Sequence, residues 1–64
     1  MDFVYPIEID SEVVSLSIDI NKHGEWDARA EINGTEMSIY ERLTEAEEAD
    51  IQRLVTVYLV ERSR

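Results

Sequence analysis

The stretch that decides the fold is residues 26–40, which read WDARAEINGTEMSIY. At its centre, Asn33-Gly34 is the favoured dipeptide of a two-residue type I′ hairpin turn, because both central positions of that turn need a positive φ. Apolar and polar residues alternate on each side of this turn, which is typical of strands with one buried face. A hairpin closed at this turn places the small Ala30 opposite the large Met37, so both strands bury the same face. The predicted strands are residues 25–32 and 35–40.

The same alternation predicts two earlier strands, over residues 3–9 and 13–21. Gly24 supplies the left-handed position of a short loop that joins the second strand to the hairpin and places Ile18 opposite Ala28. The register continues with two further pairs that share the buried face, Leu16 with Ala30 and Val14 with Ile32.

The first strand is predicted to lie at an edge of the sheet, because Pro6 has no N–H to donate to a neighbour. A turn within residues 10–13 would join it to the second strand and place Ile9 opposite Val14. The four strands then follow one another as an antiparallel meander.

A helix is predicted to follow the sheet, over residues 45–61. Thr44 and Glu47 have the spacing of a capping box, in which each side chain accepts a hydrogen bond from the other residue's backbone N–H. The stretch 54–60 is rich in β-branched residues and a strand is the alternative, but no turn residue separates it from the capped start. Apolar residues at helical spacing form a stripe able to cover the sheet: Ile51, Leu54, Val55, Tyr58 and Leu59.

These elements predict a single α+β domain over residues 1–64, in which a four-stranded antiparallel β-meander is packed on one face by a C-terminal α-helix. The chain has no cysteine, which excludes disulfide bonds and thiolate metal sites. No apolar run approaches the length of a membrane span, and the first residues lack the pattern of a secretory signal. We therefore expect a soluble, cytoplasmic protein that makes no contact with a membrane.

The charge of the chain narrows the kind of partner it can have. Asp and Glu number 15 against 6 Lys and Arg, which gives a formal net charge of -9. Direct binding to nucleic acid needs a cationic surface. A basic protein is therefore the expected partner.

The outward face of the predicted sheet concentrates much of this charge. The register places Asp19 opposite Asp27 and Glu31 opposite Glu36, although like charges in opposite positions cost about 0.2 to 1 kcal/mol. We predict that this acidic sheet face binds the basic partner; a surface that only keeps the protein soluble is the alternative. The acidic sheet face comprises Glu8, Asp19, Glu25, Asp27, Glu31 and Glu36.

The predicted helix also carries apolar side chains opposite its core stripe. A second copy of the chain would bury them in a homodimer, which would support a domain this small. Scattered exposed apolar side chains are normal on any protein and are the alternative. The helix back face comprises Ala49, Arg53, Val57 and Val60.

No residue pattern predicts an enzyme, a metal site or a cofactor. His23 is the only histidine and lies in a predicted turn. Asp19, Asn21 and His23 resemble the opening of a calcium loop, but Ala30 stands where that loop needs a bidentate glutamate. Both glycines of the chain are required by turns, which leaves none for a phosphate-binding loop.

Residues 32–47, INGTEMSIYERLTEAE, combine a final strand ending in Ile39-Tyr40 with a Leu43-Thr44 helix start and an acidic helix. This tract resembles the end of short acidic proteins encoded by tailed phages and prophages, a family without assigned functional residues. The resemblance implies a phage accessory factor in the host cytoplasm that binds a host or phage protein. The negative charge of the chain then predicts that this partner is basic and that its nucleic-acid-binding surface is occluded by imitation of phosphate. The alternative function is a self-associating structural or assembly module that uses the helix back face.

Overall fold

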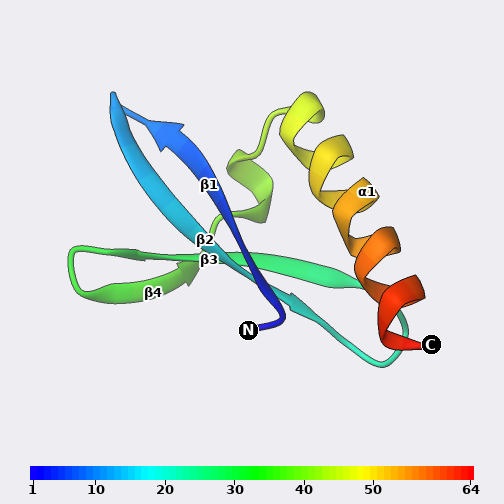
Figure 1. The fold of residues 1–64 in the computed structure, drawn as a ribbon. Coiled ribbons are helices and arrows are strands. Elements are labelled where there is room, and N and C mark those ends of the chain that lie inside the picture. Colours follow the sequence, from blue (N-terminus) through cyan, green and yellow to red (C-terminus); the bar gives the residue numbers. More distant parts are fainter.

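The computed structural model describes all residues from Met1 to Arg64. It contains one antiparallel sheet and two helices: β1 (Phe3–Ile9), β2 (Glu12–Ile20), β3 (Trp26–Ile32), β4 (Thr35–Ser38), the 3-10 helix η1 (Tyr40–Arg42) and α1 (Glu45–Arg62). The strands lie in the order β1-β2-β3-β4, and α1 lies against one face of the sheet (Figure 1). This is the predicted α+β meander with a C-terminal helix, and β1 lies at an edge as Pro6 requires.

The β3–β4 hairpin forms as predicted. Asn33 and Gly34 have φ angles of 52° and 79°, the positive values that a type I′ turn needs. The register places Ala30 opposite Met37. Local sequence therefore fixes the turn and the register of this hairpin.

Strand β4 ends earlier than predicted. It stops at Ser38, whereas the sequence pattern extends it to residue 40. The Ile39 N–H still donates to the Ala28 carbonyl at 2.9 Å, and the chain then turns into η1. The turn buries Ile39 and packs Leu43 against the core, and this apolar burial stabilises the path that leaves the sheet.

The β1–β2 hairpin is tighter than predicted. Its turn is formed by Asp10 and Ser11 alone, with φ angles of 49° and 67°, and the register pairs Ile9 with Glu12. The predicted pairing of Ile9 with Val14 is wrong by two residues, because a two-residue turn with positive φ matches the twist of the strands without a longer loop. A shift of two keeps each side chain on its predicted face.

Ser11→Gly is expected to raise the free energy of unfolding by about 1 kcal/mol, because the left-handed conformation strains any residue with a Cβ and does not strain glycine. Urea unfolding followed by circular dichroism measures this change. Ser15→Gly, within β2, is the matched control and should lower the free energy of unfolding. A loss of stability in both variants would contradict the strained turn.

Helix α1 begins at the predicted capping box. Thr44 Oγ1 accepts a hydrogen bond from the Glu47 N–H at 3.1 Å, and Glu47 Oε1 accepts one from the Thr44 N–H at 2.9 Å. The helix continues through the β-branched stretch 54–60 without interruption. Ile51 and Val55 are fully buried, as the predicted stripe requires. The buried core between helix and sheet comprises Leu16, Ile18, Ala28, Ala30, Ile39, Ile51 and Val55.

The two hairpins diverge from one another. The ladder between β2 and β3 runs only from Ile20 opposite Trp26 to Ser17 opposite Arg29. The β1–β2 and β3–β4 turns then point in different directions (Figure 1), as strongly twisted strands do. Met37 is 40% exposed as a result, although it lies opposite a buried residue. The ladder does not reach two of the predicted pairs, Leu16 with Ala30 and Val14 with Ile32.

Candidate functional site

The register brings the predicted acidic pairs together on the outward face of the sheet. Asp19 lies opposite Asp27, and Glu31 lies opposite Glu36. The six acidic residues nevertheless fall into separate groups along the strands. Asp19, Glu25 and Asp27 lie near the β2–β3 turn, Glu31 and Glu36 near the β3–β4 turn, and Glu8 near the end of β1.

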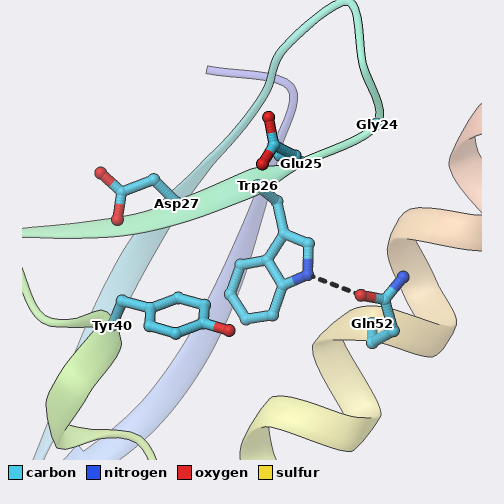
Figure 2. Close-up of a pocket in the computed structure, with 6 residues that line it drawn as sticks. All are labelled: Gly24, Glu25, Trp26, Asp27, Tyr40 and Gln52. Atoms are coloured by element: carbon cyan, nitrogen blue, oxygen red, sulfur yellow. Dashed lines mark hydrogen bonds between the residues drawn. The ribbon is translucent and has the colours of Figure 1, made fainter.

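A groove opens beside the first of these groups, where β3 begins. Its volume is about 460 Å³. Three elements build it, since Trp26 comes from β3, Tyr40 from η1 and Gln52 from α1 (Figure 2). The groove exists because β4 ends at Ser38 and leaves the start of β3 without a neighbour on that side. The lining residues are Gly24, Glu25, Trp26, Asp27, Tyr40 and Gln52.

Hydrogen bonds to side chains of α1 hold the two aromatic residues of the groove in place. The Trp26 Nε1–H donates to Gln52 Oε1 at 3.0 Å, and the Tyr40 hydroxyl donates to Glu48 Oε1 at 2.8 Å. The ring centroids lie 4.9 Å apart with an interplanar angle of 55°, a favourable tilted arrangement. The hydrogen bond to Glu48 raises the pKa of the Tyr40 hydroxyl. Side chains of α1 therefore accept hydrogen bonds from the polar atoms of Trp26 and Tyr40, while the two rings line the groove.

A second groove, of about 370 Å³, adjoins the first and extends toward the β2–β3 turn. The Asn21 side chain shapes this turn, because its Oδ1 accepts hydrogen bonds from the N–H groups of His23 and Glu25. Its Nδ2 donates to Glu25 Oε1 at 3.1 Å. His23 is an exposed residue of this turn. The second groove is lined by Asp19, Ile20, Asn21, Glu25, Trp26 and Asp27.

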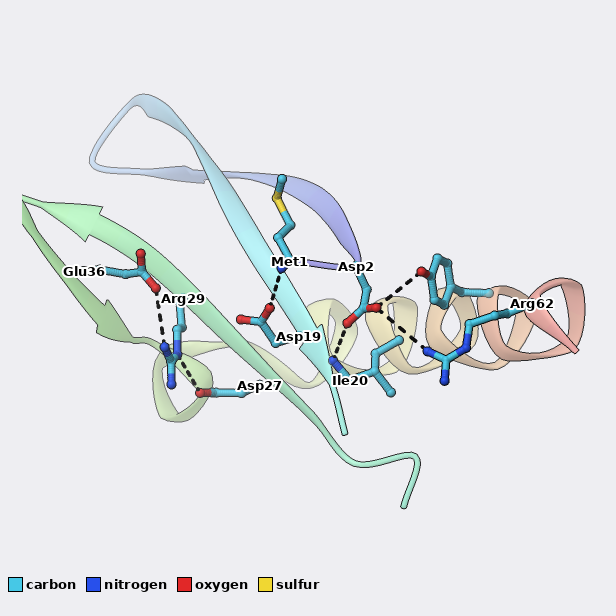
Figure 3. Close-up of polar contacts among 9 residues, drawn as sticks. Met1, Asp2, Asp19, Ile20, Asp27, Arg29, Glu36 and Arg62 are labelled. Carbon is cyan, nitrogen blue, oxygen red and sulfur yellow. Dashed lines mark hydrogen bonds and ion pairs between the residues drawn. The ribbon is translucent and has the colours of Figure 1, made fainter. Parts of the chain in front are cut away.

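Ion pairs offset part of the repulsion on the acidic sheet face. Arg29 Nε lies 3.4 Å from Asp27 Oδ2, and its Nη1 lies 3.5 Å from Glu36 Oε1 (Figure 3). The Met1 ammonium lies 3.0 Å from Asp19 Oδ1. The hydrogen bonds to Asp27 and to Glu36 raise the pKa of the Arg29 guanidinium. The carboxylates of the face that have no ion pair are Glu8, Glu25 and Glu31.

Asp27 also has a structural role beside the groove. Its Oδ1 accepts hydrogen bonds from the Ala28 N–H at 2.9 Å and from the Ser38 hydroxyl at 2.7 Å. The hydrogen bond from the Ala28 N–H satisfies a backbone donor of β3 that lies beyond the last β3–β4 pair. Substitution of Asp27 therefore changes folding as well as charge. Glu25 is the better residue for testing charge alone, because its side chain accepts a hydrogen bond only from Asn21.

Two further carboxylates tie α1 to the sheet. Asp2 Oδ2 accepts a hydrogen bond from the Ile20 N–H at 2.7 Å, and its Oδ1 accepts one from the Tyr58 hydroxyl at 3.3 Å (Figure 3). Asp50 Oδ2 accepts one from the Tyr5 hydroxyl at 2.7 Å. These contacts lower the pKa of both carboxyls; the largest cause is the Ile20 N–H for Asp2 and the Tyr5 hydroxyl for Asp50.

Acid is expected to destabilise the fold below about pH 4. Folding lowers the pKa of both carboxyls below 3.8, the pKa that they have in the unfolded chain. Each carboxylate therefore stabilises the fold at pH values above 3.8. This contribution is lost as the pH falls through the pKa of the folded state. Asp2→Asn combined with Asp50→Asn should therefore lower stability at neutral pH and flatten the acid dependence of the urea midpoint. Glu12→Gln, whose carboxylate has no ion pair, is the control. An unchanged acid dependence in the double variant would contradict the role of these contacts.

The helix back face lies outside both grooves. Val57 is 44% and Val60 is 51% exposed, and Ala49 is also exposed. Arg53 forms an ion pair with Asp50 on the same helix, with Nη2 at 2.8 Å from Oδ1. The structure thus places the four predicted residues of this face at the surface of α1.

Sequence patterns did not reveal the groove. Alternation assigns Trp26 to the core, yet it is only half-buried, because it is the first residue of β3 and lies at the rim of the sheet. Tyr40 and Gln52 meet it only because β4 ends early and α1 crosses the sheet nearby. The one available signal was a tryptophan placed directly after a turn.

The described residues include no group of three or more His, Asp or Glu side chains arranged to hold a metal ion. No helix of the structure has both the length and the apolar composition needed to cross a bilayer. No protein-family model, curated protein or solved structure matches the chain.

Proposed function

We propose that this chain is a non-enzymatic interaction protein that binds a basic protein through its acidic sheet face. The main support is the grouping of Asp19, Glu25 and Asp27 around Trp26, in a chain with a formal net charge of -9. A concentrated negative field attracts a basic partner and orients it during encounter. The exposed position of these carboxylates makes the association dependent on salt.

The finer form of the proposal is a phage accessory factor in the host cytoplasm. Carboxylates spaced along an outward sheet face imitate phosphates, so the same surface would occlude the nucleic-acid-binding site of a basic host or phage protein. The support for this form is the net charge and the resemblance of residues 32–47 to short acidic phage proteins. In this form the chain makes no direct contact with nucleic acid.

A pull-down from host lysate, read by mass spectrometry at low and high salt, tests the proposal. The wild type is expected to capture a basic protein at low salt and to release it at high salt, because salt screens exposed charges. The triple variant Asp19→Asn, Glu25→Gln, Asp27→Asn should lose this capture. Its matched control removes the same number of charges elsewhere on the face: Glu8→Gln, Glu31→Gln, Glu36→Gln.

The control triple variant should lose less of the capture than the first, because its substitutions leave the grooves beside Trp26 intact. Circular dichroism of each variant confirms that it folds. Capture that survives high salt and both triple variants would contradict a partner held by the acidic sheet face.

Self-association through the helix back face is the second candidate function. The exposure of Val57 and Val60 favours it, because a second copy that covered them would add apolar burial to a small domain. Val57→Asp combined with Val60→Asp should then convert a dimer into a monomer in sedimentation velocity, with little dependence on salt. A wild type that sediments as a monomer at high concentration would exclude this candidate.

A further inference from the structure

We infer that the groove beside Trp26 receives a long basic side chain, arginine or lysine, of the partner protein. The apolar stem of that side chain lies against the Trp26 and Tyr40 rings, and its charged head reaches the carboxylates of Glu25 and Asp27. This inference rests on the proposed function, because it takes the partner to be a basic protein. It adds the position and the chemistry of the contact.

The groove offers two different walls along one strand edge. Side chains alternate between the faces of a strand, so Glu25 and Asp27 project to one side of β3 and Trp26 projects to the other (Figure 2). The edge between these walls is open, because Ile39 makes the last backbone hydrogen bond to β3, at Ala28. A ligand that lies across this edge therefore meets rings on one side and carboxylates on the other.

The aromatic wall suits an apolar stem or a cation. Trp26 and Tyr40 lie with ring centroids 4.9 Å apart, and their polar atoms already bond Gln52 and Glu48. A ligand gains nothing from those atoms and meets mainly the rings themselves, which attract both methylene groups and cations. The two hydrogen bonds also fix the rings before binding, which reduces the entropy lost when a ligand binds.

The acidic wall retains capacity to accept hydrogen bonds. The Glu25 carboxylate has no ion pair and accepts only from Asn21, at 3.1 Å. Asp27 Oδ1 is occupied by two donors, but its Oδ2 has only the long contact of 3.4 Å with Arg29. A carboxylate can accept about four hydrogen bonds, so a cationic head finds free acceptor sites on both residues.

The length of the side chain is the property that this geometry selects. Lysine and arginine lay a flexible apolar stem along one surface while the charged head reaches another. A short cation meets the rings or the carboxylates but does not span both walls. A neutral side chain of the same length meets the rings and leaves the carboxylates without a counter-charge.

Titration with three short peptides, followed by NMR, tests the inference. The peptides share one neutral sequence and carry arginine, citrulline as its neutral counterpart, or 2-amino-3-guanidinopropionate as a short cation with the same guanidinium head. The Trp26 indole N–H gives a unique reporter resonance, because the chain has a single tryptophan. The arginine peptide should shift this resonance and the amides of residues 24–27 in a saturable manner. The other two peptides should bind at least about fivefold more weakly.

Protein variants locate the contact. Tyr40→Ala and Glu25→Gln should each weaken binding of the arginine peptide about fivefold. Tyr40 is 37% exposed, so its loss leaves the core intact. Glu31→Gln removes the same charge at the other end of β3, outside the groove, and should weaken binding much less than Glu25→Gln.

Three results would overturn the inference: shifts centred away from the groove, equal binding of the short cation, or equal weakening by Glu25→Gln and Glu31→Gln. In those cases a basic partner can still bind elsewhere on the acidic sheet face, and only the groove assignment fails. The absence of any binding by the arginine peptide, combined with no capture of a basic protein from lysate, would overturn the proposed function as well.

Discussion

Ile51→Ala is expected to lower the free energy of unfolding by about 2 to 5 kcal/mol. Ile51 is fully buried and joins α1 to the core of the sheet. Truncation of a buried isoleucine to alanine costs about 2 to 5 kcal/mol. A typical stability of about 0.05 to 0.15 kcal/mol per residue gives a chain of 64 residues only roughly 3 to 10 kcal/mol in total. At the middle of both ranges, the loss is about half of the total stability of the fold.

Urea unfolding followed by circular dichroism measures this effect. Val57→Ala is the matched control, because it removes methyl groups from the same helix at a position that is 44% exposed. Its expected change in unfolding free energy is within about 0.5 kcal/mol, as for other surface substitutions. Equal losses in the two variants would contradict the packing of α1 through its buried stripe.

Glu25→Lys is expected to weaken binding of the basic partner by at least about tenfold at low salt, because like charges brought together across an interface cost several kcal/mol. Glu25 lines both grooves beside Trp26. It has no ion pair within the chain, so its replacement breaks no internal contact with a cation. A loss of binding in this variant therefore reflects a change at the interface more than a change in the fold.

Glu31→Lys is the matched control for this reversal. It changes the net charge by the same amount but lies outside both grooves beside Trp26. Calorimetric titration with the captured partner should show a much smaller loss for this variant. The difference between the variants should narrow at high salt, because the Debye length falls to about 3 Å at 1 M. Equal weakening by both reversals would show that net charge alone governs binding.

The elements that sequence predicted correctly are those set by neighbouring residues. Asn33-Gly34 fixes its hairpin because few other dipeptides accept two positive φ angles. Thr44 and Glu47 fix the start of α1 because each caps the other's backbone N–H. The opposed pair Glu31 and Glu36 follows from the Asn33-Gly34 turn, since a hairpin turn determines which residues of its strands face each other. The pair Asp19 and Asp27 follows in the same way from the β2–β3 turn at Gly24.

The remaining features depend on contacts between distant segments. The turn at Asp10 and Ser11 contains no glycine, so its sequence does not predict the positive φ angles that both residues adopt. The groove requires Trp26, Tyr40 and Gln52 to meet, and this depends on the early end of β4 and on the path of α1. Such arrangements follow from the packing of the whole core and leave no periodic trace in the sequence.

The fluorescence of Trp26 gives the most direct test of binding at the acidic sheet face, since no other tryptophan contributes to the signal. Titration of the wild type with an arginine-rich peptide at low salt should change the emission to a plateau, and high salt should abolish the change. Glu25→Gln should need clearly more peptide to reach the plateau than Glu31→Gln, because only Glu25 lines the grooves beside Trp26. An emission that stays constant throughout the titration, or a change that high salt leaves intact, would contradict electrostatic capture of a basic partner beside Trp26.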